Sequence, residues 1–222
     1  MSGPVALSTL RAGTRKRADV SGATTRHTDA EIDGYINAAW DELYAFVAGT
    51  SEDYFSTLYS WNTVVGTSTY ALPSDFNWLR DALAFYNGWK TPLQRIEIAD
   101  LADWYNASSW NQAGVGYVLL GQNIQLVPTP QAIYSVEMRY VPLPTDLVNP
   151  SDTVMCYSGW EEFIVWRAAA TIIAIDGRDN SIQLAEAERQ KQRILDEAHR
   201  RNLHQPRSII RRYKVKRRQR WV

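Results

Sequence analysis

The chain has 222 residues, 45% of them apolar and 22% charged, which is ordinary globular usage and excludes wholesale disorder and a collagen-like chain. Its single cysteine, Cys156, excludes an intramolecular disulfide framework and a cysteine-based metal cage. Residues 200–222 hold ten Arg and Lys and no Asp or Glu. The remaining residues, 1–199, form an acidic body with 14 basic and 24 acidic residues. Such a division of charge points to a macromolecular partner.

Two helices are predicted at the start of the chain. Residues 1–6 are expected to fray, and Ser8 is expected to cap a first helix in LRAGTRKRADV. Thr28 and Glu31 have capping-box spacing and open a second helix of about six turns. Apolar residues recur along that helix at intervals of three and four: Ile32, Tyr35, Ile36, Ala39, Trp40, Leu43, Phe46 and Val47.

A β-rich block is predicted over residues 53–142. DYFSTLYSWNTVV and TYALP are rich in β-branched and aromatic residues, which favours strands. LRDALAFYN is assigned as a strand, although its pattern also fits a helix, and WKTPLQRIE is assigned as one more strand. After a short helix in IADLADWYN, three strands follow in YVLLG, NIQLVP and YSVEMRYV, the first two joined by a tight turn at Gly121–Gln122–Asn123.

Two more helices are predicted after the β-rich block. Ser158 is expected to cap the helix in GWEEFIVWRAAATIIAIDG, which ends at Gly177. Its apolar run, Phe163–Ile175, is too short to span a membrane. Asn180 or Ser181 opens the last helix, IQLAEAERQKQRILDEAHRR. The apolar face of this helix is assigned to Leu184, Ala187, Ile194, Leu195 and Ala198.

These elements predict an α+β fold. The simplest arrangement is a four-helix bundle core formed by both chain ends, with an inserted β-rich subdomain between its halves. The expected divisions are 1–52 for the N-terminal helices, 53–150 for the β-rich subdomain, 151–205 for the C-terminal helices and 206–222 for an extended basic C-terminal arm.

Catalytic motifs are scarce in this sequence. His27, His199 and His204 lack metal-ligand spacing and are interpreted as surface histidines, and no HExxH, glycine-rich phosphate loop or GxSxG occurs. Adjacent carboxylates such as Glu161 and Glu162 point to different sides of a helix, so compensation of the helix dipole explains them better than glycoside hydrolysis does. We therefore expect no enzyme activity, no cofactor and no metal.

Two features favour contacts with other macromolecules. Trp89 and Trp110 fall in expected loops and are candidate contacts with a tail protein or a neighbouring subunit, because Trp is enriched in interface cores. The arm mixes its charges with apolar side chains, so we expect it to order on a partner, either an acidic protein surface or nucleic acid. The arm residues assigned to this contact are Ile209, Ile210, Arg211, Arg212, Tyr213, Trp221 and Val222.

An ordered set of motifs carries a resemblance to a known family. LSTLRAGTRKRAD and TDAEIDGYINAAWDELY open the set, and GTSTYALPSDF, GQNIQLVPTP and YSVEMRYVPLPTDL follow. EEFIVWRAAATIIA and AEAERQKQRILDEA close it. Over about residues 7–205, the chain resembles the head-to-tail adaptor proteins of tailed bacteriophages, also called head completion or tail tubular A-like proteins.

The resemblance implies a structural virion protein at the head–tail interface, made in the host cytoplasm. Such proteins form a dodecameric ring under the portal, join it to a tail or nozzle protein, and line part of the channel for genome ejection. Genomic DNA would pass without specific binding, which suits the acidic body, and no membrane would be contacted. The resemblance also implies that the C-terminal arm binds the portal.

Two other functions stay open at this level. A nucleic-acid-binding protein could use residues 207–222 as a DNA arm, but it would be expected to carry cations on its folded body as well. A cell-wall hydrolase, an activity credited to some members of the family, would need convergent polar residues, and none can be identified in the sequence.

Overall fold

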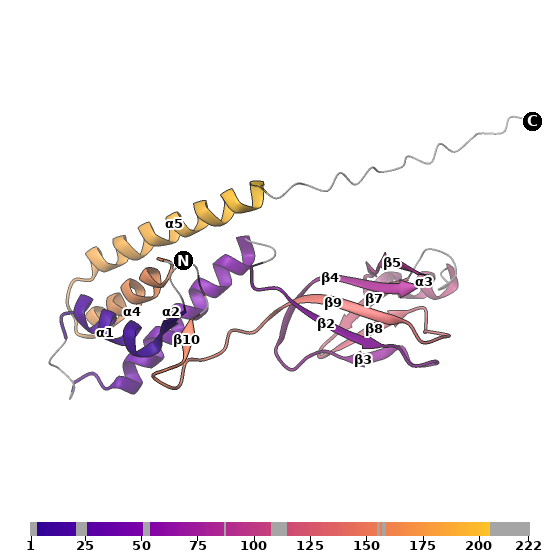
Figure 1. Ribbon diagram of the computed structural model, residues 1–222, viewed down its shortest axis with the longest axis horizontal. Helices are drawn as coiled ribbons and strands as arrows, with labels where there is room; N and C mark the ends of the chain where they lie inside the picture. The colour runs from indigo at the N-terminus through magenta and orange to yellow at the C-terminus, as the bar shows by residue number, and fades with distance from the viewer. Residues whose placement is uncertain are drawn as a thin grey trace, which may run out of the picture.

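The protein is described by a computed structural model for residues 4–20, 26–50, 54–86, 88–107, 115–154, 156 and 159–204. Four of its helices lie together at one end of the molecule, and two four-stranded sheets lie at the other end (Figure 1). The mixed α+β composition predicted from the sequence is confirmed.

The helices and strands follow in this order along the chain. The α-helices are α1 (Leu7–Arg17), α2 (Asp29–Thr50), α3 (Leu101–Ala107), α4 (Glu161–Ile175) and α5 (Ser181–His204), and a 3₁₀ turn, η1 (Ile98–Asp100), precedes α3. The strands are β1 (Val5–Ala6), β2 (Thr57–Asn62), β3 (Thr69–Ala71), β4 (Phe76–Tyr86), β5 (Trp89–Pro92), β6 (Gln94–Arg95), β7 (Gly116–Leu120), β8 (Asn123–Val127), β9 (Ser135–Pro142) and β10 (Thr153–Val154).

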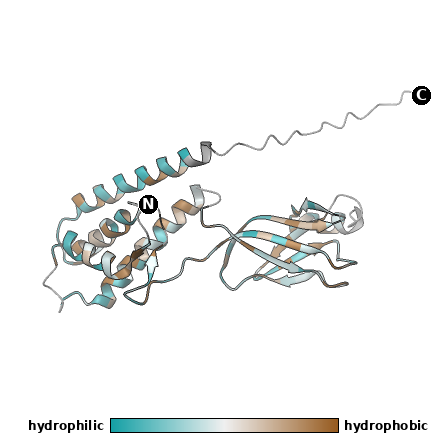
Figure 2. Ribbon diagram, in the orientation of Figure 1, coloured by the Kyte–Doolittle hydropathy of each residue, from teal (hydrophilic) through white to brown (hydrophobic). Residues whose placement is uncertain are grey.

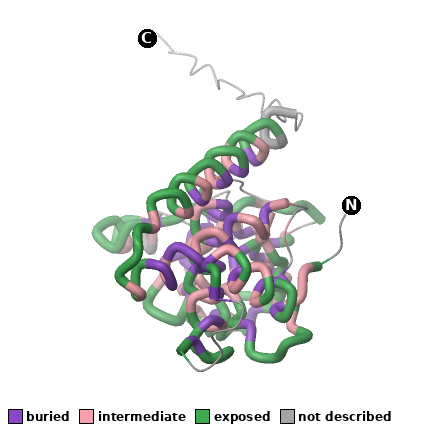
Figure 3. The backbone as a smooth tube through the Cα atoms, turned by 90° about the vertical axis from the view of Figure 1, so that its left-hand side faces the viewer, coloured by how far each residue is buried: buried purple, intermediate pink, exposed green. Residues whose placement is uncertain are grey.

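Helix α4 is the central element of the helical part, because it contacts α1, α2 and α5. These helices bury one shared core that includes Leu10, Ile36, Phe163 and Ile194. Gly13 allows α1 to approach α4 closely, since a Cβ there would lie 3.2 Å from Cγ1 of Val165. Helix α5 is mostly hydrophilic (Figure 2), and its outer side is exposed, whereas buried segments lie in the middle of the helical part (Figure 3).

The two four-stranded sheets pack face to face. Their strand orders are β2-β9-β4-β5 and β3-β8-β7-β6, and all pairs are antiparallel except β6 with β7. Alternate residues of both sheets, such as Ala84, Met138, Ile124 and Leu126, fill the core between them. WKTPLQRIE forms two strands rather than the single one predicted, because the chain crosses from one sheet to the other at Leu93.

The ends of α1 and α4 differ from prediction. Residues Val5 and Ala6 do not fray, because they pair with β10, and Ser8 does not cap α1. The backbone N–H groups of Leu7 and Ser8 donate instead to the carbonyls of Asp152 (2.8 Å) and Pro150 (3.0 Å). At α4 the N-cap residue is Trp160 and not Ser158, which lies outside the described residues.

Other predicted helix ends are confirmed. The N–H of Thr28 donates to Oε2 of Glu31 at 2.8 Å, and the N–H of Glu31 donates to Oγ1 of Thr28 at 3.3 Å, which is a capping box. Gly177 has φ +67° after the last turn of α4, as a left-handed C-terminal residue should.

The predicted apolar face of α5 is wrong at one residue. Leu184 is exposed, because the buried row runs through Ala187, Gln190, Ile194 and Ala198. One turn earlier this row continues at Gln183, which is half-buried, so Leu184 falls beside the row and faces solvent.

Contacts between α2 and the first sheet join the helical part to the sandwich. The hydroxyl of Tyr44 donates to the carbonyl of Pro142 at 2.7 Å, and Arg80 on β4 donates to the carbonyl of Ala48. Val141, at the end of β9, belongs to the helical core, and Trp78 packs against it. The sandwich is therefore held at the C-terminal half of α2.

Candidate interaction surfaces

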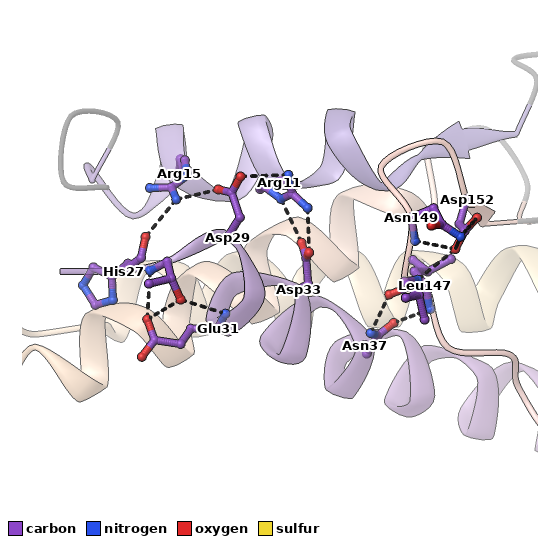
Figure 4. A network of polar contacts seen from close by, with 12 residues as sticks. Arg11, Arg15, His27, Asp29, Glu31, Asp33, Asn37, Leu147, Asn149 and Asp152 are labelled. Carbon is purple, nitrogen blue, oxygen red and sulfur yellow. Dashed lines mark hydrogen bonds and ion pairs between the residues drawn. The ribbon is translucent and has the colours of Figure 1, made fainter. Parts of the chain in front are cut away.

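Charged residues tie α1 to the start of α2 (Figure 4). Nε and Nη2 of Arg11 donate to the two carboxylate oxygens of Asp33, at 2.8 and 2.6 Å. Arg15 donates to Asp29 and to the carbonyl of His27, both at 2.8 Å. The hydrogen bond from Arg15 is the main cause that lowers the pKa of Asp29. These bonds orient the helices that carry the surfaces described below.

The chain segment after β9 is fixed by side chains. Asn37 on α2 donates to the carbonyl of Leu147 at 3.0 Å and accepts from its N–H at 2.9 Å. One carboxylate oxygen of Asp152 accepts the N–H groups of Val148 (2.8 Å) and Asn149 (2.7 Å). These hydrogen bonds lower the pKa of Asp152, and the one from the N–H of Asn149 has the largest effect. The segment from residue 142 to residue 153 is therefore held beside α2.

A groove of about 570 Å³ lies between α2 and this segment; we call it the junction groove. Three aromatic rings form its floor: the ring centroids of Tyr44 and Phe55 are 4.1 Å apart, and those of Trp40 lie 5.6 and 5.9 Å from them. Its rim includes Leu143 and Asp146. The lining of the groove thus combines aromatic side chains with the carboxylate of Asp146.

The end of the sandwich that points away from α1, α2, α4 and α5 (Figure 1) carries several exposed apolar residues, and we call it the distal tip. Strands β2, β4 and β9 reach this end together, because Ser135 pairs with both Asn62 and Phe85. The tip comprises Val64, Val65, Phe85, Trp89 and Ile133, each at least 47% exposed. Such a concentration of exposed apolar side chains is typical of interaction surfaces.

Hydrogen bonds hold the two loops of the distal tip together. The N–H of Thr63 donates to the carbonyl of Tyr134 at 2.8 Å, and Oγ1 of Thr63 donates to the carbonyl of Ala132 at 3.0 Å. The N–H of Gly66 donates to the carbonyl of Pro130 at 2.9 Å. The apolar side chains are therefore presented on a preorganised backbone, which reduces the entropic cost of binding.

Only some of the predicted contact residues fall within the described part of the chain. Trp89 is 77% exposed, as a contact residue should be, but it lies in β5 opposite Tyr86 and not in a loop. Aromatic and β-branched residues on both sides of Trp89 favour strand structure, so the pairing of β4 with β5 continues up to the turn at Gly88. Trp110 and the arm residues 209–222 lie outside the described residues, so their contacts stay predictions.

His27 is not a surface histidine. Its side chain is buried, and Nε2 lies 3.1 Å from Oδ1 of Asp176, which also pairs with Arg26 and Arg178. Burial raises the pKa of Asp176, but the hydrogen bond with His27 and the positive charges of Arg26 and Arg178 outweigh burial and lower this pKa below its ordinary value. No local pattern predicts this pair, because its members are 149 residues apart in the chain. His199 is exposed, as predicted.

Metal-ligating and thiol side chains are not clustered in the described residues. Within them, no group of three or more His, Cys, Asp and Glu side chains could hold a metal ion. The pKa of the Cys156 thiol is raised to about 12, mainly by burial. The thiol therefore stays protonated near neutral pH and is a poor nucleophile. Among the described helices, none is long and apolar enough to cross a membrane.

Comparison with known proteins identifies the family. No curated protein matches the chain. The family model of the SU10 adaptor protein matches residues 6–213, which include all the described helices and strands except the start of β1. The apolar distal tip suits a protein that acts through contacts with other proteins. The chain therefore belongs to the SU10 adaptor protein family, a family of phage head–tail adaptors.

Proposed function

We propose that this adaptor forms a ring between the portal and the tail of a phage virion, with the DNA exit channel running through it. Membership of the SU10 adaptor protein family carries this proposal. The resemblance noted in the sequence implies 12 copies in the ring and no enzyme activity. The net charge of −10 over residues 1–199 supports passage of DNA without binding, because a negative channel wall repels phosphate.

The helices of both chain ends are proposed to form a four-helix bundle, with residues 53–150 as the inserted subdomain. Two observations support this division: α1, α2, α4 and α5 share one core, and a separate core lies between the two sheets. Hydrogen exchange should then show two groups of slowly exchanging amides, which denaturant opens at different concentrations. A single common opening would contradict the division.

The two ends of the adaptor are proposed to serve different partners. The distal tip would contact the tail or nozzle protein, and the basic arm, residues 206–222, would contact the portal. Fully extended, the 17 arm residues could reach roughly 55–60 Å, at about 3.3–3.6 Å per residue. Their charges would accelerate the encounter with an acidic groove, and Trp221 would be the main apolar anchor.

Electron microscopy of the purified protein, alone and with portal, tests the ring. We expect monomers or weak association without portal and rings with it, because ordering the arm costs entropy that only a partner offsets. A stable ring at low micromolar concentration without portal would contradict this expectation. Absence of rings and of portal binding under both conditions would overturn the adaptor proposal itself.

Arm variants separate portal binding from DNA binding. Deletion of residues 207–222 should abolish portal binding, and Trp221→Ala should weaken it even at high salt. Arg217→Ala and Arg218→Ala should matter mainly at low salt. A DNA arm would instead bind duplex with a log–log salt slope of about −0.9 per phosphate contacted, and Trp221 would matter little. Unchanged portal binding by the deletion variant would refute the portal assignment.

A further inference from the structure

Strand β2 forms an exposed edge of the first sheet. It is the outermost strand in the order β2-β9-β4-β5, and within the described part of the chain no other strand pairs with its outer side. Five of its six residues are exposed, and the sixth, Trp61, is half-buried. An edge strand presents unpaired backbone N–H and C=O groups to its surroundings. The outer side of β2 is therefore open to another extended chain.

The register of the sheet identifies which backbone groups point outward. The N–H of Thr63 donates to the carbonyl of Tyr134 at 2.8 Å, so these two residues form a hydrogen-bonded pair just beyond the end of β2. Such pairs recur at every second residue of an antiparallel ladder, and the ladder of β2 with β9 has no register shift. The odd-numbered residues of β2 therefore bond to β9, whereas the even-numbered residues point their N–H and C=O groups away from the sheet. The outward residues are Leu58, Ser60 and Asn62.

The other free edges of the two sheets are poorly suited to pairing. The N–H of Leu93 donates to the carbonyl of Ala82 at 2.8 Å, which places Pro92 on the outward row of β5, where it has no N–H to donate. Strand β3 has three residues, and β6 has two, one of which is Arg95. Strand β2 has six residues and contains neither proline nor a charged residue. Short strands, charges and prolines are the usual protection of an edge, so β2 alone among these four edges is unprotected.

We propose that an extended segment of the tail protein adds to β2 as a further strand of the first sheet. This inference rests on the proposed contact between the distal tip and the tail, because β2 leads directly into the tip at Val64 and Val65. A partner that covers the tip therefore meets the free row of backbone groups beside it. Main-chain hydrogen bonds would provide the affinity, and Leu58, which is 60% exposed, would favour an apolar side chain next to it.

Two other occupants fit the edge less well. Two copies of β2 would pair about a two-fold axis, and such a pair closes on itself, whereas the proposed ring needs contacts between different surfaces of neighbouring subunits. The edges that a neighbouring subunit could offer instead are short or carry a proline. The basic arm of this chain has cations at alternate positions, at Arg212, Lys214 and Lys216, and β2 has no carboxylate to attract them. A segment of the tail protein is therefore the occupant that we assign.

Residue-resolved hydrogen exchange of the full-length chain, alone and bound to the tail protein, tests the pairing. The strand contains its own control, because the amides of Tyr59 and Trp61 bond to β9 and should exchange slowly in both states. The amides of Leu58, Ser60 and Asn62 should exchange rapidly in the free chain and at least tenfold more slowly in the complex. Equal exchange of these outward amides in the two states would overturn the proposal.

The same measurement distinguishes the other occupants. Protection of the outward amides that grows with the concentration of the chain alone would show that a second copy pairs with β2. Protection that is already present in the free chain, and is lost on deletion of residues 207–222, would show that the arm pairs with it. Either result would overturn the assignment to the tail protein.

A proline on the outward row tests the hydrogen bonds themselves. Ser60→Pro removes an outward N–H and keeps the bonds to β9, as proline does on edge strands, and should weaken tail-protein binding at least tenfold. Ser60→Thr keeps the N–H and should bind as the wild type does. Thr69→Pro is the matched control, because the N–H of Leu126 donates to the carbonyl of Ser68 and so places Thr69 on the outward row of β3. Urea unfolding of each variant confirms that the fold is retained.

The outcomes for the added strand and for the tip contact can be told apart. If Trp89→Ala weakens tail-protein binding while Ser60→Pro does not, the added strand is refuted and the tip contact stands. If the wild-type chain does not bind the tail protein, both are refuted. Equal weakening by Ser60→Pro and Thr69→Pro would also overturn the proposal, because the effect would not depend on the edge of β2.

Discussion

Replacing Trp89 by Ala tests the distal tip as a contact surface. The side chain is 77% exposed, and a Trp can bury up to about 250 Å², so roughly 190 Å² is free for a partner to cover. At about 25 cal/mol per Å² this area corresponds to about 5 kcal/mol. The cost of ordering the interface and the methyl group that Ala retains reduce the expected loss to about 2–4 kcal/mol, the range of a strong hot spot.

Folding and assembly are measured separately for this variant. In urea unfolding, Trp89→Ala should stay within about 0.5 kcal/mol of the wild type, because the side chain is exposed in the folded chain. Its binding to the tail protein, or to a neighbouring subunit in the ring, should weaken by roughly 30-fold to 1000-fold, which is the same free energy expressed as an equilibrium constant.

Ile182→Ala is the matched control for Trp89→Ala. Ile182 is 70% exposed on α5, away from the distal tip, so its loss should leave tail attachment unchanged. If Trp89→Ala attaches tails and closes rings as well as the control does, the interpretation of Trp89 as a contact residue is wrong. A loss of tail attachment in both variants would also refute it, since the effect would not be specific to the tip.

Three further predictions concern the folded chain itself. Tyr44→Phe removes a hydrogen bond that joins α2 to the sandwich and should lower the free energy of unfolding by about 1 kcal/mol, or Tm by roughly 2–4 °C. Tyr35 is a half-buried tyrosine on the same helix, so Tyr35→Phe should lower the free energy of unfolding by less. Gly116→Ala should lower the free energy of unfolding by about 1–3 kcal/mol, because the new Cβ would lie 2.8 Å from the carbonyl oxygen of Gln94. Gly34→Ala, on the open side of α2, should instead raise the free energy of unfolding. Chemical denaturation measures both variants, and equal effects would refute the steric argument. Burial raises the pKa of Cys156 to about 12, above the usual 9.0. At pH 8 the thiolate fraction is therefore about a thousandfold lower in the folded chain than in the unfolded chain. Ellman's reagent should react far faster with this thiol in urea than in buffer, and equal rates would contradict its burial.

Local spacing in the sequence determined most of the secondary structure. Thr28 and Glu31 are three residues apart, so their reciprocal hydrogen bonds form within one turn and need no other part of the chain. The two-residue turn at Gly121 and Gln122 likewise follows from a glycine that adopts φ +57° between two apolar strands. LRDALAFYN fitted a strand or a helix, and the structure decided for the strand β4, whereas the motif order was enough to predict the family.

Contacts between distant residues were decided only by the tertiary structure. Ser8 has the side chain of a helix cap, yet the N–H groups at the start of α1 are satisfied by carbonyls of residues 150 and 152. His27 is buried beside Asp176, which lies far from it in the chain. The junction groove needs α2 and the segment after β9 on either side. The residues in these contacts are separated by up to about 150 positions in the chain. Bringing them together costs conformational entropy, which the burial of the two hydrophobic cores offsets.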